Sequence, residues 1–352
     1  MINTWTWFIW IAAVLIALSV TRNPLYIILI LLFLFLLDTQ LALRSRIING
    51  AEENSSIPVS PFRIALMLIT LSAVFNAAIS HYGETVLFSL PASFPLIGGS
   101  ITLEAFVYGA LNGLMLFGIF YAFFILNRAL SVRRLIRVIP RAFYPVAVVT
   151  SIAITFIPNT IRQYHQIREA QSVRGHRMRG IRDWLPLIIP LLTGGLERAL
   201  SLSESMSARG LAASTANQEV WWGRIMVLFG LLLLLIGWIL TLFTDWLLFG
   251  SVLLISGIGL LLIVLWLIGR STPHSTYILE KWTWQDALIL SGVAAVISAL
   301  LLQLPFMDQE TLHYEVYPSM HLPGFDPFIG ILLLGLLMPA IIIYLSNKSV
   351  QE

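Results

Sequence analysis

Apolar runs long enough to cross a lipid bilayer follow one another through this chain, and they constrain its fold more than any other feature. A membrane-spanning helix needs about 20 predominantly apolar residues. Of the 352 residues 58% are hydrophobic and 11% are charged, whereas about a quarter of the residues in a soluble domain are charged. The sequence therefore predicts an all-α polytopic membrane protein and excludes an ordinary soluble enzyme. The eight expected spans cover residues 5–21, 25–43, 62–80, 103–126, 225–243, 247–268, 286–304 and 327–345.

Basic residues divide unevenly between the two sides of such a membrane protein. If the N-terminus is cytoplasmic and Arg63 sits at the inner edge of its span, 20 of the 21 Lys and Arg residues lie inside, and Arg22 is the exception. The outside loops 81–102 and 305–326 contain no Lys or Arg. Under the positive-inside rule this asymmetry predicts a multi-pass cell (inner or plasma) membrane protein with both termini in the cytoplasm. The inner segments are then 44–61, 127–224, 269–285 and the tail after 345.

A few polar and small residues lie within the predicted spans. Asp38, Asn76 and Asn112 are costly in lipid, so we expect each to face another helix or a partner, and we assign them no function. Gly109 and Gly113 form a G-x-x-x-G pair, which allows a second helix to approach closely. These glycines predict helix packing.

The segment 127–224 is neither a plain loop nor a soluble domain. It begins with clustered arginines, continues with an apolar run over 146–157, and then becomes basic again after Pro158. An apolar run that short with basic flanks argues against a full crossing. We expect one long helix over 143–175, bent near Pro158, that begins at membrane depth and ends in the cytoplasm.

A second helix of the same kind is expected over 184–210, because an apolar stretch over 187–192 is followed by a polar half. Both helices pass from apolar to polar and both end in Arg-Gly, at Arg174-Gly175 and Arg209-Gly210. A glycine there suits the left-handed position that stops a helix. One such pair indicates only a helix cap with inside-positive charge. Two copies, 35 residues apart, favour docking to another protein, because the fork of arginine binds carboxylates and carbonyl oxygens.

Three segments carry a resemblance to a known family: Ala170-Gln171-Ser172-Val173-Arg174-Gly175, Leu185-Pro186-Leu187-Ile188-Ile189-Pro190-Leu191-Leu192 and Met206-Ser207-Ala208-Arg209-Gly210. Their arrangement resembles the T component of energy-coupling factor transporters, the EcfT or CbiQ family, which carries two Ala-Arg-Gly motifs on long coupling helices. The resemblance covers roughly residues 1–243. Two positions depart from the family pattern: Val173 stands where alanine is usual, and Ser207 where an acidic residue is often found.

The resemblance implies a coupling subunit that moves a vitamin or a transition-metal ion with two ABC-type ATPase subunits and a small membrane S component. The expected ATPase-docking residues are Val173, Arg174, Gly175, Ala208, Arg209 and Gly210. The expected parts of the chain are 1–126 with four spans, the coupling region 127–224, the last family-like span 225–243, and a three-span extension over 247–352.

No G-x-x-x-x-G-K-[ST] loop for nucleotide phosphates occurs in the sequence. We therefore expect this chain to be non-catalytic and to hold no cofactor, with ATP and Mg²⁺ bound on the partner ATPases. Nucleic-acid binding, which the eleven arginines between 128 and 182 could suggest, is better explained by inside-positive charge near anionic lipid and by partner docking.

Two other functions remain open from the sequence. A permease of a binding-protein-dependent importer carries Glu-Ala-Ala with a glycine six residues after the glutamate, and Glu169-Ala170 with Gly175 satisfies that fragment but accounts for one motif only. A membrane-embedded metalloenzyme is suggested by the acidic and histidine residues of loop 305–326. His313 and His321 lack a standard ligand spacing, however, and the chain has no cysteine for a thiolate site.

Overall fold

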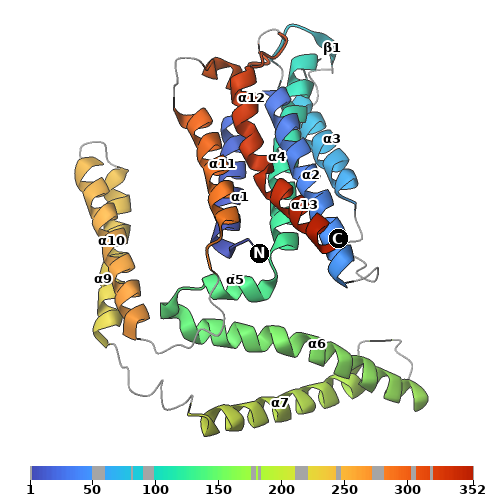
Figure 1. Cartoon of the computed structure of the whole chain (residues 1–352), viewed down its shortest axis with the longest axis vertical. Coiled ribbons are helices and arrows are strands. Elements are labelled where there is room, and N and C mark those ends of the chain that lie inside the picture. Colours follow the sequence, from blue (N-terminus) through green and yellow to red (C-terminus); the bar gives the residue numbers. More distant parts are fainter. Residues whose placement is uncertain are drawn as a thin grey trace. The chain divides into compact units, whose positions relative to one another are not determined.

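The computed structural model describes residues 2–49, 60–80, 82–89, 99–175, 180, 184–210, 221–242, 247–271, 281–302, 307–317 and 320–351. Within these ranges the chain forms two compact units. The first combines Met1–Ser131 with Leu279–Glu352, and the second is Val132–Ile278. Figure 1 shows the helices that build them.

The first unit is a bundle of apolar helices. Its N-terminal helices are α1 (Thr4–Val20), α2 (Pro24–Asn49), α3 (Pro61–Ile79) and α4 (Leu103–Ala129). Its C-terminal part contains α11 (Trp284–Leu301), the 3₁₀ turn η4 (Gln309–Leu312), α12 (Pro327–Leu333), the 3₁₀ turn η5 (Leu334–Leu337) and α13 (Met338–Gln351). The core is formed by side chains that are almost fully buried, among them Trp10, Val14, Leu18, Ile30, Leu37, Ile125, Ile289 and Val296.

Helices α3 and α4 pack at the predicted small-residue pair. A Cβ atom placed on Gly109 would lie 2.6 Å from the Ser72 backbone oxygen, and one on Gly113 would lie 2.7 Å from Ile69 Cα. Such distances are shorter than van der Waals contact, so only glycine permits this approach. The Asn76 amide spans the same interface and donates to the Ala105 carbonyl at 2.6 Å. The packing predicted for the G-x-x-x-G pair is confirmed.

Asp38, an acidic residue in the middle of an apolar run, has two partners on α4. Its carboxylate accepts from Arg128 at 2.9 Å and from the Tyr121 hydroxyl at 3.2 Å. This pairing compensates the cost of placing a carboxylate in an apolar helix. Because Asp38 and Arg128 are 90 residues apart, no local pattern indicated the contact.

The C-terminal helices complete the bundle by packing against α1 and α2. Asp286, fully buried in the first turn of α11, accepts from the Asn3 backbone at 2.8 Å and from the Thr6 hydroxyl at 3.0 Å. It also accepts from the Thr283 backbone at 2.9 Å and from the Thr283 hydroxyl at 2.7 Å. The two ends of the chain are thereby joined in one packed unit. The sequence also predicts that the extension over 247–352 lies outside the part that binds the ATPases. That expectation stays a prediction.

The predicted span over 327–345 matches one long apolar stretch, Pro327–Lys348, whose α-helix is interrupted by the 3₁₀ turn η5. Pro339 has no N–H to donate to Gly335, four residues earlier, and the next carbonyl, that of Leu336, accepts from the Trp10 indole at 3.1 Å. Gly335 also lies so close to Gly292 of α11 that neither position has room for a Cβ atom. The proline and this close contact together account for a turn that apolar composition alone did not predict.

A short antiparallel hairpin lies in the segment expected to be an outside loop. Strands β1 (Val86–Ser89) and β2 (Ser100–Thr102) pair with Val86 opposite Thr102 and Ser89 opposite Ser100. The β-branched and aromatic residues of both segments favour extended backbone. This hairpin was not predicted, because strands of four and three residues give too short a pattern to detect.

The second unit consists of α5 (Val132–Val138), the 3₁₀ turn η1 (Arg141–Phe143), α6 (Tyr144–Val173), α7 (Leu185–Ala208), α9 (Trp221–Thr241) and α10 (Leu247–Ser271). Helices α9 and α10 form a hairpin, and α6 lies beside α7 (Figure 1). The long helices expected over 143–175 and 184–210 are therefore present, and Pro158 lies inside α6 as predicted.

Within the described residues, eight helices are long and apolar enough to cross a membrane by length and composition. This result confirms the all-α polytopic membrane class. The set differs from the eight predicted spans. It includes α6 and α7, its least apolar members, whereas α1 (Thr4–Val20) and the stretch Ile225–Thr241 of α9 are counted as shorter apolar helices. Length and composition alone do not distinguish a helix that crosses the bilayer from one that lies partly in it.

Candidate functional site

The C-terminal end of α6 is shaped by a short run of backbone hydrogen bonds. Arg174 caps the helix with φ −74° and ψ 2°, and its N–H donates to Ala170 at 3.4 Å. Gly175 follows with φ +83°, and its N–H donates to Ser172 at 3.0 Å. The positive φ turns the chain out of the helix and leaves Arg174 as its last residue.

The end of α7 repeats this geometry almost angle for angle. Arg209 caps the helix with φ −83° and ψ 4°, and its N–H donates to Ser205 at 3.2 Å. Gly210 has φ +82° and donates to Ser207 at 3.0 Å. The left-handed glycines predicted from sequence are confirmed at both positions. The two helix ends are therefore structurally equivalent.

Both ends are open to solvent. All six predicted docking residues are exposed, and the side chain of Val173 is 88% exposed. Neither guanidinium pairs with a carboxylate anywhere in the described part of the chain. A Cβ atom on Gly175 or Gly210 would meet nothing within 4 Å, so backbone conformation, and not lack of space, accounts for glycine at these positions. Whether these residues contact an ATPase stays a prediction.

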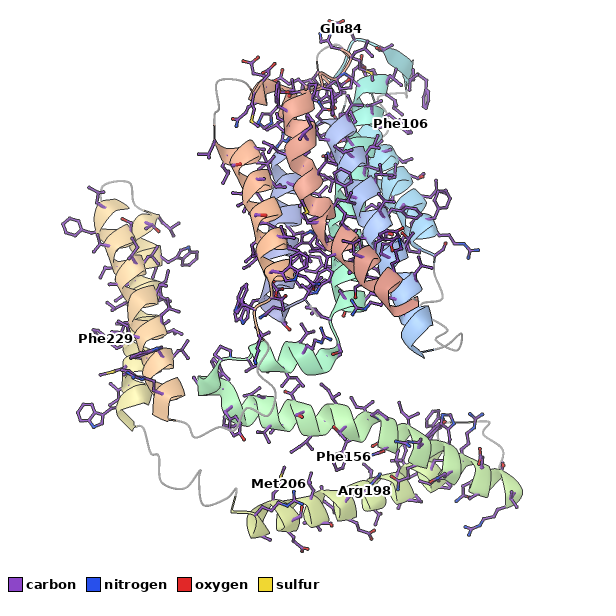
Figure 2. All side chains as sticks on the ribbon, in the orientation of Figure 1. Glu84, Phe106, Phe156, Arg198, Met206 and Phe229 are labelled. Atoms are coloured by element: carbon purple, nitrogen blue, oxygen red, sulfur yellow. The ribbon has the colours of Figure 1, made fainter. Side chains whose placement is uncertain are left out.

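Helices α6 and α7 contact each other through one polar cluster. Arg198 of α7, labelled in Figure 2, donates through Nη2 to the Gln163 side-chain oxygen of α6. Its Nε donates to the Gly194 carbonyl of its own helix at 2.9 Å, which fixes the guanidinium over the crossing. Gly194 lies against the Gln163 amide, whereas Gly195 beside it faces open space. Sequence reasoning missed this contact, because exposed polar residues on two separate helices carry no pairing signal.

The crossing relates equivalent positions of the two helices. Gln163 and Arg198 are 35 residues apart, and so are Arg174 and Arg209. Each arginine thus follows its own crossing residue by eleven positions, or about 16 Å of helix. Measured along its own helix, each Arg-Gly end therefore lies at the same distance from the crossing.

The apolar halves of both helices remain uncovered. Helix α6 has no buried residue, and Leu187 is the one buried residue of α7. Large apolar side chains project from both helices (Figure 2). The most exposed of them on α7 include Leu185, Ile189, Leu192, Leu196 and Leu200, each more than half exposed. Surfaces of this kind are covered by lipid or by another protein in a folded assembly.

The outside loop offers no metal site within the described residues, where no group of three or more His, Cys, Asp or Glu side chains comes together. His313 and His321 are both exposed, and the His321 carbonyl accepts from Tyr314 at 2.7 Å. Pro318, which lies between them, falls outside the described residues, as do Arg177, Arg179 and Arg182 beyond the end of α6.

No family model matches the chain. About a quarter of it is similar to EcfT proteins. The energy-coupling factor transporter transmembrane protein EcfT of Brevibacillus brevis is 29% identical over 108 residues, which are 27% of this chain and 41% of that protein. EcfT of Bacillus selenitireducens is 32% identical over 89 residues, or 23% of this chain and 33% of that protein. EcfT of Acidaminococcus fermentans is 30% identical over 112 residues, or 29% and 41%.

The chain thus spans between 33% and 41% of the length of the curated EcfT relatives it matches. Their names describe transmembrane proteins of energy-coupling factor transporters. This likeness agrees with the family resemblance found in the two Arg-Gly motifs, and it supports an EcfT-like protein over part of the chain.

Proposed function

We propose that this chain is the transmembrane coupling (T) subunit of an energy-coupling factor transporter. It transmits motion from two cytoplasmic ABC-type ATPases to a small membrane S component that binds a vitamin or a transition-metal ion. The observation that carries the proposal is the pair of equivalent helix ends. Arg174 and Arg209 cap α6 and α7 with matching backbone angles, and both are exposed. The partial similarity to EcfT proteins supports the same function.

The proposed partner at this face is a pair of similar ATPases. Two anchors with matching backbone geometry, each eleven residues past the same crossing, fit two similar sockets. Each guanidinium presents a planar set of donors to the carboxylates and carbonyl oxygens of a groove. Nucleotide chemistry belongs to the ATPases, and this chain contributes no catalytic group.

Coupling requires contacts that differ between two states of the assembly. If the ATPases approach each other on binding ATP, each socket carries one arginine with it, and the eleven-residue arms of α6 and α7 move about the Gln163–Arg198 contact. The exposed apolar halves of the same helices then transmit the motion to the S component and the lipid around it. The helices act as levers, and the polar crossing acts as their pivot.

Replacement of each arginine by alanine tests the proposal. We expect Arg174→Ala and Arg209→Ala each to cost on the order of 2 to 4 kcal/mol of docking, as for a buried arginine hot spot. That corresponds to roughly 30- to 1,000-fold in affinity. The double variant should insert in the membrane and yet fail to co-purify with the ATPase pair.

Arg168→Ala is the matched control, because Arg168 lies on the same helix, is exposed and carries the same charge, but is not at the helix end. It should leave co-purification and uptake unchanged. Equal small losses for Arg168, Arg174 and Arg209 would reduce the two motifs to ordinary surface charge and refute the proposal.

A further inference from the structure

Two residues that stand out in the sequence meet at one cavity of the first unit. Arg22 is the single basic residue expected on the outer side, and Asn112 is a polar residue in the apolar helix α4. Both line a cavity of about 250 Å³. Its other lining residues are Ser19, Ile27, Tyr108, Leu111, Met115 and Tyr314.

Neither residue is satisfied by the protein. Among the described residues no carboxylate lies within ion-pair distance of Arg22, and the Asn112 amide makes no hydrogen bond. The Arg22 side chain is exposed and free to bind a ligand, and an unpaired amide inside a span is unfavourable. Their convergence on one cavity points to a ligand that accepts hydrogen bonds and carries negative charge.

The turn that presents Arg22 is held firmly. The Arg22 backbone N–H donates to Leu312 at 2.9 Å, and the Asn23 amide donates to the carbonyls of Thr311 and Gly324, each at 2.7 Å. Asn23 itself is buried. These contacts fix the backbone of the turn between α1 and α2, so the turn that carries the exposed Arg22 side chain needs little ordering on binding.

The lining sets the chemistry of the ligand. Arg22, Asn112, Ser19 and Tyr108 can all donate hydrogen bonds, whereas the Tyr314 hydroxyl already donates to His321. Ile27, Leu111 and Met115 add an apolar part to the wall. A cavity of 250 Å³ holds roughly eight waters at about 30 Å³ each, which is room for a small head group but not for a drug-sized ligand.

We propose that this cavity binds a phosphate-bearing anion, with phosphate oxygens on the Arg22 guanidinium and the Asn112 amide. Arginine is the side chain best suited to phosphate, because its fork makes two parallel charge-assisted hydrogen bonds. The phosphate can belong to the head group of an anionic lipid or to a free anion. This site is separate from the Arg-Gly ends, so it does not depend on ATPase coupling.

The test uses the full chain purified in nonionic detergent and titrated with short-chain phosphatidylglycerol or with inorganic phosphate. Binding is measured by native mass spectrometry and by the shift in melting temperature. Saturable binding of phosphatidylglycerol alone identifies a lipid, and saturable binding of inorganic phosphate identifies a free anion; either result supports the site.

Arg22→Gln should weaken binding at least about tenfold, which is the loss of one charge-assisted hydrogen bond. Arg63→Gln is the matched control, because Arg63 is also exposed at the end of an apolar helix but lines no part of this cavity. Met115→Trp keeps every charge and fills the cavity, so it should weaken binding even if Arg22→Gln folds poorly. Equal effects of the Arg22 and Arg63 variants, or no saturable binding of either probe, would overturn the proposal.

Discussion

Alanine at Gly194 tests how the crossing of α6 and α7 is held together. A Cβ atom at this position would lie too close to the Gln163 side-chain nitrogen, so the amide must move, and we expect its hydrogen bond with Arg198 to be lost. A hydrogen bond to a charged group contributes about 1.5–3 kcal/mol. Alanine in a helix interior is favoured over glycine by about 1 kcal/mol, which offsets part of that loss. The net expectation for Gly194→Ala is a crossing weakened by about 0.5–2 kcal/mol.

Gly195 provides a control one residue away. A Cβ atom there meets nothing within 4 Å, so Gly195→Ala gains the helix preference and loses no contact. The chain has no cysteine, so cysteines introduced at Ser172 and Ser207 are the only sites that a nitroxide label can modify. Pulsed electron paramagnetic resonance then measures the distance between the two helix ends. We expect Gly194→Ala to broaden the distance distribution and Gly195→Ala to leave it unchanged.

A distribution that is the same for both alanine variants would refute the idea that Gln163 and Arg198 form the pivot. The proposed motion of α6 and α7 about that contact would then be wrong, although the proposed docking of Arg174 and Arg209 would still stand. ATPase co-purification measured on the same samples separates the two questions.

Three further outcomes follow from the first unit and from the charge pattern. Asp286→Ala leaves four donors of a buried site without their acceptor and should cost about 3–5 kcal/mol in thermal unfolding. Asp308→Ala removes one exposed cap hydrogen bond, from the Glu310 N–H, and should cost only about 1 kcal/mol. Deleting 279–352 removes helices packed on α1 and α2, so it should lower the melting temperature while ATPase binding, measured by pull-down, survives. An impermeant thiol reagent should label Leu322→Cys but not Ser172→Cys in intact cells.

Helix positions could be predicted from the sequence because they depend on local patterns. The ends of α1, α3 and α4 fall within a few residues of the expected spans, since apolar runs and Pro61 mark them directly. Gly175 and Gly210 could be predicted as left-handed because glycine after a long helix is the usual stop.

Contacts between distant residues could not be predicted in this way. Arg128 pairs with Asp38, which is 90 residues away in the sequence, and the Asn3 backbone donates to Asp286, which is 283 residues away. Nothing near either residue in the sequence specifies its partner, because each pair forms only when the helices pack. For the same reason the equivalence of the two Arg-Gly ends was partly visible in sequence, whereas the contact at Gln163 that relates them was not.

Site-specific photo-crosslinking tests the docking of the two helix ends most directly. A photoreactive amino acid at Val173 or at Ala208 stands beside each arginine on an exposed surface, and one at Val149 on the exposed apolar half of α6 serves as control. The account predicts ATPase adducts from Val173 and Ala208 in the assembled transporter, with lipid or membrane-protein adducts from Val149. Absence of ATPase adducts at both helix ends, in cells where the ATPases are present and uptake is active, would contradict it.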